Sequence, residues 1–476
     1  MSRLIRNTSF YTIGNILPKA AGFFLLPLYT KFLTPEDYGI ISSMNILMTI
    51  LMVFFTMSIE RSIYRLYFDH KTETDKKDYL GTIFITLTLN ACIVLVAVLL
   101  GRNLISKVFT SIPFYPFYSF AIASVFFSVF GVIPSIYFQV EQKAGKFVLL
   151  GLAQFFIGTI LKVYFVVFTG KGADGVLLAG LLKTIIFLPF FVFIIVKIIN
   201  FKFNKDIMKE SMIYSIPLMP MILSAWILNL SDRIFIERYF TLKDVGLYSL
   251  SYKLAELLLI LSTAFNKAYD PLFYKIANQI DQVEARQKLT KYNKVYSIVL
   301  IYCSLAISLF AREFIQLLDA KFRSAYQMVP IIIIGVLFGQ ISGLFNKSMY
   351  QEKKTKPIMF LTFYAAMLNI VLNFLFVPNY GAYGAAYATT ITFIFFFVIK
   401  YFYSKKCYFI PLAWKELFYY LGLAVIIVSA FYFTNFNLWL SLLLKTLIMF
   451  GFTFLLLYRY KTTILKLIPI KRRIKQ

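Results

Sequence analysis

The chain has 476 residues, of which 60% are apolar, 19% aromatic and 15% charged. Soluble domains are about 45–50% apolar and about 25% charged, so this composition excludes a globular protein that folds in water. The formal net charge is +27, from 49 Lys and Arg against 22 Asp and Glu. Such an excess is typical either of a nucleic-acid partner or of basic loops on one side of a bilayer.

Apolar segments long enough to cross a membrane follow one another along the chain. A transmembrane helix needs about 20 mostly apolar residues, and about fourteen such segments are present. They are 9–32, 38–59, 79–100, 113–138, 147–169, 175–199, 212–236, 246–265, 295–311, 328–349, 357–377, 385–402, 417–433 and 438–458. The basic residues at the start run directly into the first segment, which predicts a retained helix rather than a cleaved signal peptide. The pattern predicts an all-α polytopic membrane protein.

The basic residues follow the topology of these segments. With the amino terminus in the cytoplasm, both termini and the loops after even-numbered segments hold about 34 of the 49 Lys and Arg. The opposite loops hold about nine, so both termini are expected in the cytoplasm. Topology therefore explains the charge, and no nucleic-acid partner is expected. The longest polar stretch, 266–294, is expected to form an amphipathic helix at the inner surface.

Two short motifs recur at nearly the same spacing. Residues 34–42 and 241–249 share Thr, Asp, Gly and Ser at matching offsets, 207 residues apart. Residues 172–175 (Gly-Ala-Asp-Gly) and 381–384 (Gly-Ala-Tyr-Gly) match 209 residues apart. Turns also reuse Gly and Asp by chance, but two matches at nearly one spacing favour an internal repeat. Six segments separate the copies, which predicts parallel repeats related by an axis along the membrane normal.

The repeat defines the expected architecture. Residues 1–204 and 205–406 are predicted to form two pseudo-symmetric six-helix lobes around a central cavity. The last two segments fall outside the repeat, so 407–476 is expected to supply two added helices and a basic tail. Pro217 and Pro220 interrupt the hydrogen-bond ladder of the seventh segment, which predicts a break in that helix.

Charged residues inside the segments point to the functional region. A charge at the centre of a membrane helix costs about 2.5–3.5 kcal/mol on insertion scales, so it usually faces a cavity or a partner. The set is mostly basic: Lys19, Lys162, Lys183, Asp232, Arg233, Lys253, Glu256 and Lys445. For Lys162, Lys183 and Lys445, snorkelling toward the interface or structural pairing explains the charge equally well.

Spacing selects the candidates for a cavity. Asn15 and Lys19 are four residues apart and share a helix face, as do Asn229 and Arg233. We expect a cavity for an anionic, partly apolar cargo to be lined by six residues: Asn15, Lys19, Arg61, Arg65, Arg233 and Lys253. Asp232 and Glu256 are the candidates for coupling transport to a proton or sodium gradient. Structural pairing of Asp232 and Arg233 is the alternative.

Catalytic and cofactor signatures are missing from the sequence. The one histidine, His70, lies in a polar stretch, and the three cysteines are widely spaced without a CxxC motif. Phosphate-binding loops of the GxxxxGKS and GxGxxG types do not occur. We expect no enzyme activity, no metal and no organic cofactor.

Several stretches together resemble a known family. They are 7–15, 26–39, Ser231-Asp232-Arg233, and 246–249 followed by Tyr252-Lys253. With these, the chain resembles the Wzx-like polysaccharide-biosynthesis flippases of the multidrug/oligosaccharidyl-lipid/polysaccharide exporter superfamily. The resemblance implies alternating access between two six-helix bundles, often with two extra helices. Its implied cargo is an undecaprenyl-pyrophosphate-linked oligosaccharide repeat unit, moved from the cytoplasmic to the outer leaflet of the bacterial inner (plasma) membrane for O-antigen or capsule.

The resemblance also implies partners, and rival functions stay open. Its implied partners are the lipid-linked oligosaccharide, the bilayer and the polysaccharide polymerase machinery, and a monomer is expected. A cation-coupled drug antiporter of the same fold is one rival, although a basic cavity disfavours cationic drugs. A peptidoglycan lipid II flippase is another, although such proteins concentrate arginine in the first helix, where this chain has only Lys19. A membrane glycosyltransferase or polymerase would need a large outer loop or an acid, base or metal motif.

Overall fold

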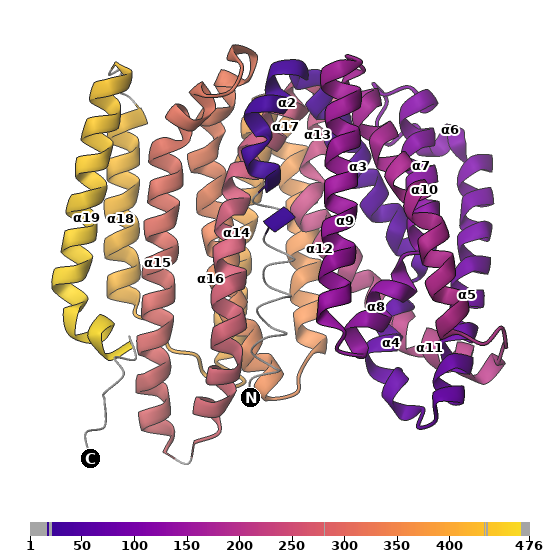
Figure 1. Ribbon diagram of the computed structural model, residues 1–476. Coiled ribbons are helices and arrows are strands. Elements are labelled where there is room, and N and C mark those ends of the chain that lie inside the picture. The colour runs from indigo at the N-terminus through magenta and orange to yellow at the C-terminus, as the bar shows by residue number, and fades with distance from the viewer. Residues whose placement is uncertain (1–16, 19–20, 280, 433, 435–436, 468–476) are drawn as a thin grey trace, which may run out of the picture.

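The computed structural model describes residues 17–18, 21–279, 281–432, 434 and 437–467, and every regular element in these ranges is a helix (Figure 1). Asn15 and Lys19 lie outside the described residues. The first half contains α2 (Leu26–Phe32), α3 (Pro35–Thr56), α4 (Glu60–Leu66), η1 (Tyr67–Asp69), α5 (Glu73–Leu100), α6 (Arg102–Ile105), η2 (Phe114–Tyr118), α7 (Ser119–Val129), α8 (Val132–Val140), α9 (Ala144–Val163), η3 (Tyr164–Phe168) and α10 (Gly172–Ile198).

The rest of the chain forms the second half and two added helices. The second half contains α11 (Lys205–Ser215), η4 (Ile216–Leu218), α12 (Met219–Leu230), α13 (Asp232–Tyr239), α14 (Leu242–Ala277), α15 (Gln282–Gln316), η5 (Ala320–Met328), α16 (Val329–Gln351) and α17 (Lys356–Ser404). The added helices are α18 (Trp414–Tyr432) and α19 (Leu438–Leu467). The expected break in the seventh segment is present as the single 3-10 turn η4, which contains Pro217.

Twelve helical segments of the described residues are long and apolar enough to cross a membrane. One of them, the 49-residue α17, contains both expected segments 357–377 and 385–402, which meet at the non-helical Gly381. The twelve therefore account for every expected segment except 9–32, of which 9–16 and 19–20 lie outside the described residues. The prediction of an all-α polytopic membrane protein is confirmed.

The stretch 266–294 does not form a separate surface helix, so this expectation is wrong. Helix α14 continues to Ala277 and α15 begins at Gln282, so the charged stretch extends two spanning helices. Tyr269, Phe273 and Leu289 from these extensions are almost fully buried. The apolar side of the stretch is therefore covered by neighbouring helices instead of resting on the bilayer surface.

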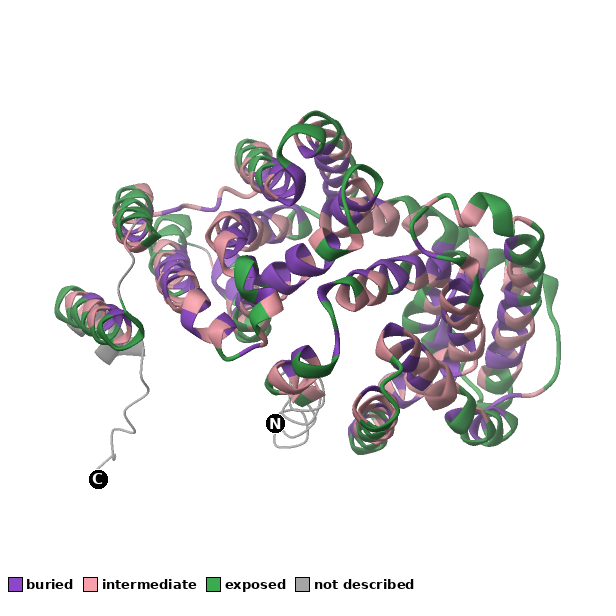
Figure 2. Cartoon of the chain, turned by 90° about the horizontal axis from the view of Figure 1, so that it is seen from above, coloured by how far each residue is buried: buried purple, intermediate pink, exposed green. Residues whose placement is uncertain are grey.

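Buried apolar side chains form a separate core in each half. One cluster runs from Met44 to Ile199 and joins helices α3 to α10. The other takes Leu26 and then residues from Ile236 to Phe452. Seen from above, buried residues line the inward faces of the helices and exposed residues cover the outside (Figure 2). Each half thus has its own packed interior.

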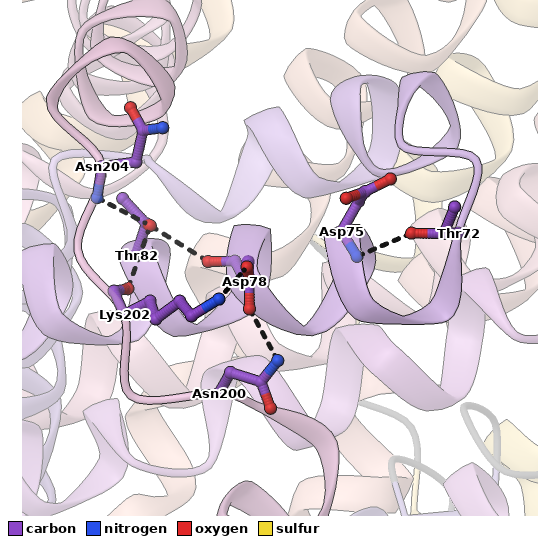
Figure 3. A network of polar contacts seen from close by, with 7 residues as sticks. All are labelled: Thr72, Asp75, Asp78, Thr82, Asn200, Lys202 and Asn204. Carbon is purple, nitrogen blue, oxygen red and sulfur yellow. Dashed lines mark hydrogen bonds and ion pairs between the residues drawn. The ribbon is translucent and has the colours of Figure 1, made fainter.

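A polar network fixes the link from α10 to the second half. Asp78 accepts hydrogen bonds from Asn200 Nδ2 at 2.6 Å and from Lys202 Nζ at 3.1 Å, as Figure 3 shows. Thr82 Oγ1 donates to the Lys202 carbonyl at 3.2 Å and accepts from the Asn204 N–H at 3.2 Å. Helix α11 then packs against α4 and α5 before η4 leads to α12. The link and α11 are therefore held on the first half.

The added helices pack on α15 at the edge of the second half (Figure 1). Glu313 on α15 accepts from Lys445 Nζ at 2.7 and 2.9 Å and from Ser441 Oγ at 2.8 Å. All three side chains are buried. Lys445, which stands inside an apolar segment, is therefore paired and ties α19 to the second half.

The two copies of the first sequence motif meet where α3 and α14 cross. Thr34 with Asp37 and Thr241 with Asp244 form the same capping box at the starts of α3 and α14. A Cβ atom on Gly39 would lie 2.0 Å from the Leu242 carbonyl oxygen, and one on Gly246 would lie 1.9 Å from the Pro35 carbonyl oxygen. Glycine at both positions therefore lets the two backbones touch.

The first glycine of each copy of the second motif has a positive φ. Gly172 and Gly381 have φ values of +57° and +56°, a backbone conformation that residues with a side chain rarely adopt. Next to Gly172, the Ala173 N–H donates to Asp37 Oδ1 at 2.9 Å, which links α10 to the capping box of α3. Both predicted motif pairs thus mark equivalent places in the two halves.

Candidate functional site

A cavity of about 980 Å³, which we call the large cavity, lies mainly within the first half. Helix α3 lines it from Ile41 to Thr56, which corresponds to about 22 Å of helix. Helices α4, α7, α9 and α10 supply most of the other walls, whereas Ile222 and Lys253 enter from the second half. The cavity therefore extends through much of the membrane depth and faces the second half on one side.

Positive charge dominates the wall of this cavity. Its described lining residues include four cations, Arg61, Lys162, Lys183 and Lys253, and one carboxylate, Glu60. Glu60 Oε1 lies 3.7 Å from Arg61 Nε at the end of the cavity that α4 lines. Burial raises the pKa of Glu60, and its contact with Arg61 offsets this only in part. Away from this end of the cavity, Lys162, Lys183 and Lys253 line the wall, and Glu60 is the one acidic residue among the described lining residues.

Small and polar residues of α9 and α10 open the space that the lysines occupy. Gly151, Gln154, Gly158 and Lys162 follow each other at helical spacing on the face of α9 that lines the cavity. A Cβ atom on Gly158 would lie 3.0 Å from Cδ of Lys183 on α10. Gly158 therefore leaves room for the aliphatic stem of Lys183. This stripe in an apolar helix is the sequence signal that would have favoured a cavity over snorkelling.

Uncharged polar groups line the rest of the cavity. Hydroxyl and amide side chains come from α3, α7, α9 and α10: Asn45, Thr49, Thr56, Ser124, Ser128, Gln154, Thr159 and Thr184. Tyr29 and Phe155 add aromatic surface. Such side chains can donate and accept hydrogen bonds with a polyhydroxylated ligand. The wall thus combines cations for an anion with groups suited to sugars.

The structure separates the residues expected to line one cavity. Arg61 and Lys253 line it. Arg65 lies on the surface of α4, where it pairs with Asp69 at 2.8 Å and its side chain is 60% exposed. Glu256 is exposed on α14 and is not part of the lining. Asn15 and Lys19 fall outside the described residues, although their neighbours Pro18 and Gly22 line the cavity.

Asp232 lies in a buried polar cluster of the second half. Its carboxylate accepts hydrogen bonds from Tyr248 Oη at 2.6 Å, Thr389 Oγ1 at 2.7 Å and Asn373 Nδ2 at 2.8 Å. Asn369 Oδ1 accepts from Asn373 Nδ2 at 3.0 Å and from Ser231 Oγ at 3.1 Å. We call these residues the Asp232 cluster: Ser231, Asp232, Tyr248, Asn369, Asn373 and Thr389. All are buried, so sequence neighbours of Asp232 alone could not reveal its partners.

Arg233 points into the second half and not into the large cavity. Its Nη1 donates to the Asn229 carbonyl at 2.8 Å. The guanidinium carbon lies 4.4 Å from the centre of the Tyr252 ring and 5.0 Å from that of Tyr248. Cations are attracted to aromatic faces at such distances, most strongly where water is excluded. Asp232 and Arg233 therefore share Tyr248, whose hydroxyl donates to the carboxylate and whose ring faces the guanidinium, while their other partners differ.

Solved structures share this arrangement of helices. Lipid II flippase MurJ in an inward closed conformation aligns with a TM-score of 0.71 and 16% identity, over 95% of this chain and 99% of that chain. An inward-facing multidrug resistance MATE family transporter of the MOP superfamily gives 0.58 at 15% identity, over 83% and 94%. A point mutant of the Vibrio cholerae MATE transporter VcmN gives 0.57 at 15% identity, over 85% and 96%. The fold is that of this class of membrane transporters.

The chain belongs to the polysaccharide biosynthesis protein family, whose family model matches residues 28–322. It is 22% identical to the capsular polysaccharide biosynthesis protein CapF of Staphylococcus aureus over 419 residues, which cover 85% of this chain and 99% of the relative. It is 25% identical to Lsg locus putative protein 1 of Haemophilus influenzae over 283 residues, or 58% and 67% of the two chains. The resemblance to polysaccharide-biosynthesis proteins of this superfamily is therefore confirmed.

Proposed function

We propose that this protein is a flippase for a lipid-linked oligosaccharide used in cell-surface polysaccharide biosynthesis. The cargo is an undecaprenyl-pyrophosphate-linked repeat unit, and its head group occupies the large cavity. The observation that carries the proposal is the presence of four cations and one carboxylate in the wall of that cavity. Membership of the polysaccharide biosynthesis family supports the same class of cargo.

The energetics of the cavity favour an anionic ligand. A charge inside the membrane is costly, and three lysines that share one cavity also repel each other. A diphosphate would offset both the cost of the buried charges and the repulsion among the lysines. Ammonium and guanidinium groups form strong, charge-assisted hydrogen bonds with phosphate oxygens. A cationic drug would add to the repulsion instead. The lining therefore supports a flippase over a drug antiporter.

The remaining parts of the cargo fit the surroundings of the cavity. Sugar hydroxyls would meet the hydroxyl and amide groups of α3, α7, α9 and α10, and the polyprenyl chain would stay in the bilayer. The head group would enter from the leaflet next to Arg61 and leave at the opposite end after the two halves rock against each other. We assign the Arg61 end to the cytoplasm, with both termini there and the protein in the bacterial inner (plasma) membrane as a monomer.

We further propose that Asp232 couples this motion to a proton or sodium gradient. Asn373 Oδ1 in the Asp232 cluster is buried without a hydrogen-bond partner among the residues that the structure describes, and carboxylate, amide and hydroxyl oxygens suit a hard cation. The same carboxylate could instead take up a proton. Either event would neutralise the charge to which Tyr248 on α14 donates. Because α14 also carries Lys253, loss of the charge on Asp232 would change how α14 is held and therefore how Lys253 is presented to the cavity.

Substitution of the two buried lysines tests the flippase proposal. In a strain that depends on this gene for its surface polysaccharide, Lys162→Gln and Lys183→Gln are expected to reduce the polymer at least about tenfold, since a charged hydrogen bond is lost. Arginine at either position should restore more polymer than glutamine. The matched control is Lys107→Gln, which removes an exposed lysine outside the cavity. Accumulation of the intact lipid-linked repeat unit would identify the cargo, whereas accumulation of lipid II would favour a peptidoglycan precursor. Normal polymer in the double variant would contradict the proposal.

A further inference from the structure

A second hollow lies on the lipid-facing side of the first half. It has a volume of about 670 Å³ and is formed by α8, α9, α10 and the connection 141–143. We call it the α8–α10 groove. Large apolar side chains that are exposed in the protein line it, including Leu149 at 70%, Phe190 at 47% and Phe193 at 57%. In a membrane, such side chains face acyl chains, and the volume is in the range of pockets that hold small ligands.

Three lysines from separate elements surround one end of this groove. They are Lys143 in the connection before α9, Lys146 in the first turn of α9 and Lys197 in the last turn of α10. No acidic residue is among the described residues that line it. Outside the lining, Glu141 Oε2 lies 3.6 Å from Lys143 Nζ, and Glu141 Oε1 accepts a hydrogen bond from Tyr67 Oη. Lys146 and Lys197 are exposed and have no ion pair among the described contacts.

These charges stand at or next to the ends of spanning helices, where headgroups would be found. Lys197 and Lys143 stand at the helix ends that face the same side of the membrane as α4 and α11 (Figure 1). Lys197 Nζ lies 3.8 Å from the centre of the Phe193 ring, and Lys143 Nζ lies 4.5 Å from that of Tyr137. The aromatic rings thus lie directly beside the ammonium groups. The groove therefore joins an apolar wall to a cationic rim, as an amphipathic anion requires.

We propose that the α8–α10 groove binds an anionic glycerophospholipid of the surrounding bilayer. The phosphate would lie among Lys143, Lys146 and Lys197, and an acyl chain would lie along Leu149, Phe190 and Phe193. Basic pockets between membrane helices are known to bind anionic lipid headgroups. Helix α9 separates this groove from the large cavity, so the site is distinct from that of the proposed cargo. The proposal does not depend on what the large cavity transports.

Native mass spectrometry of the delipidated full chain in detergent tests this proposal. The probes are phosphatidylglycerol and phosphatidylcholine with identical acyl chains. The wild type should bind phosphatidylglycerol more tightly, and K143Q/K146Q/K197Q should weaken that binding at least about tenfold, since each basic residue near a lipid surface contributes to binding. The control K291Q/K353Q/K354Q removes three exposed lysines outside the groove and should bind as the wild type does.

A photo-crosslinking amino acid locates the lipid without removing any lysine. Placed at Leu149, it should react with phosphatidylglycerol in preference to phosphatidylcholine. Placed at Ile160, which is also exposed on α9 but outside the groove, it should react with both lipids equally. Equal binding of the two lipids by the wild type, or equal binding of phosphatidylglycerol by both triple variants, would overturn the proposal. Displacement of the lipid by millimolar inorganic phosphate would also overturn it, in favour of a free anion.

Discussion

Ser42 Oγ and Ser249 Oγ lie 2.7 Å apart at the crossing of α3 and α14, and they are equivalent residues of the two sequence repeats. The contact therefore lies on the pseudo-symmetry axis that relates the halves. It follows closely after Gly39 and Gly246, which bring the backbones together. In alternating access, the halves separate at one end while they close at the other. We interpret this crossing as the closed gate at the end from which the cargo would leave.

A disulfide between these two positions should lock the gate. Cysteines at 42 and 249, in a chain whose native Cys92, Cys303 and Cys407 are replaced by serine, would lie close enough for a bond of about 2.05 Å after a small shift. Oxidation should stop polysaccharide export, and a reductant should restore it. The single S42C variant should export under both conditions. Continued export by a fully cross-linked chain would show that the crossing does not open.

Gly246→Ala should weaken the same contact. The new Cβ atom would lie 1.9 Å from the Pro35 carbonyl oxygen, so the helices must separate at their starts. Cross-linking of cysteines at 42 and 249 should fall at least about fivefold, because a strain of about 1 kcal/mol already shifts an equilibrium by that factor. Gly343→Ala is the control, since nothing lies within 4 Å of its added Cβ. Undiminished cross-linking in Gly246→Ala would contradict close backbone contact.

Glu237 forms a second contact between the halves. This buried residue of α13 accepts a hydrogen bond from the Ser111 N–H of the first half at 2.6 Å. Glu237→Gln would replace a charged acceptor by a neutral one, which costs about 1 kcal/mol and should favour opening about fivefold. A cysteine at Tyr29, which lines the cavity, should then react faster with a membrane-impermeant maleimide added from outside. An unchanged or slower reaction would show that Glu237 does not hold the gate.

Asp232→Asn should uncouple transport from the ion gradient. The amide keeps the size of the side chain but removes the charge that Tyr248, Asn373 and Thr389 satisfy. The proton gradient and the sodium gradient would be collapsed in separate experiments. Export by the wild type should fall when the coupling gradient is lost, whereas export by Asp232→Asn should be low and unaffected by the loss of either gradient. The control is Glu352→Gln, an exposed acidic residue outside the Asp232 cluster. A variant that responds as the wild type does would remove Asp232 from coupling.

The repeat was predictable because its residues perform specific tasks. Thr and Asp form a capping box at the start of each crossing helix, and Gly allows backbone contact. Few other residues serve these roles, so the pattern survives in the sequence of both halves. Positive φ at Gly172 and Gly381 imposes a similar restriction. The two-lobe fold therefore follows from local chemistry that can be read from the chain.

The functional residues were less predictable because a charge in a membrane helix does not identify its partner. Asp232 and Arg233 resemble cavity residues by position, yet their partners come from α14 and α17 and enclose them within the second half. Lys162 and Lys183 resemble snorkelling residues, yet Gly158 opens the space in which they face the cavity. Which helices pack together decides these outcomes, and spacing along a single helix does not contain that information.

Translocation of a defined lipid in vesicles tests the central claim most directly. The purified chain would be reconstituted with an undecaprenyl-pyrophosphate-linked oligosaccharide that carries a fluorophore on its sugar. A membrane-impermeant quencher then reports how fast the fluorophore changes leaflet. We expect transfer by the wild type and at least about tenfold slower transfer by the Lys162→Gln, Lys183→Gln double variant, because the phosphate would lose its charged partners. Transfer no faster than in protein-free vesicles, or equal transfer by the double variant, would contradict the proposed function.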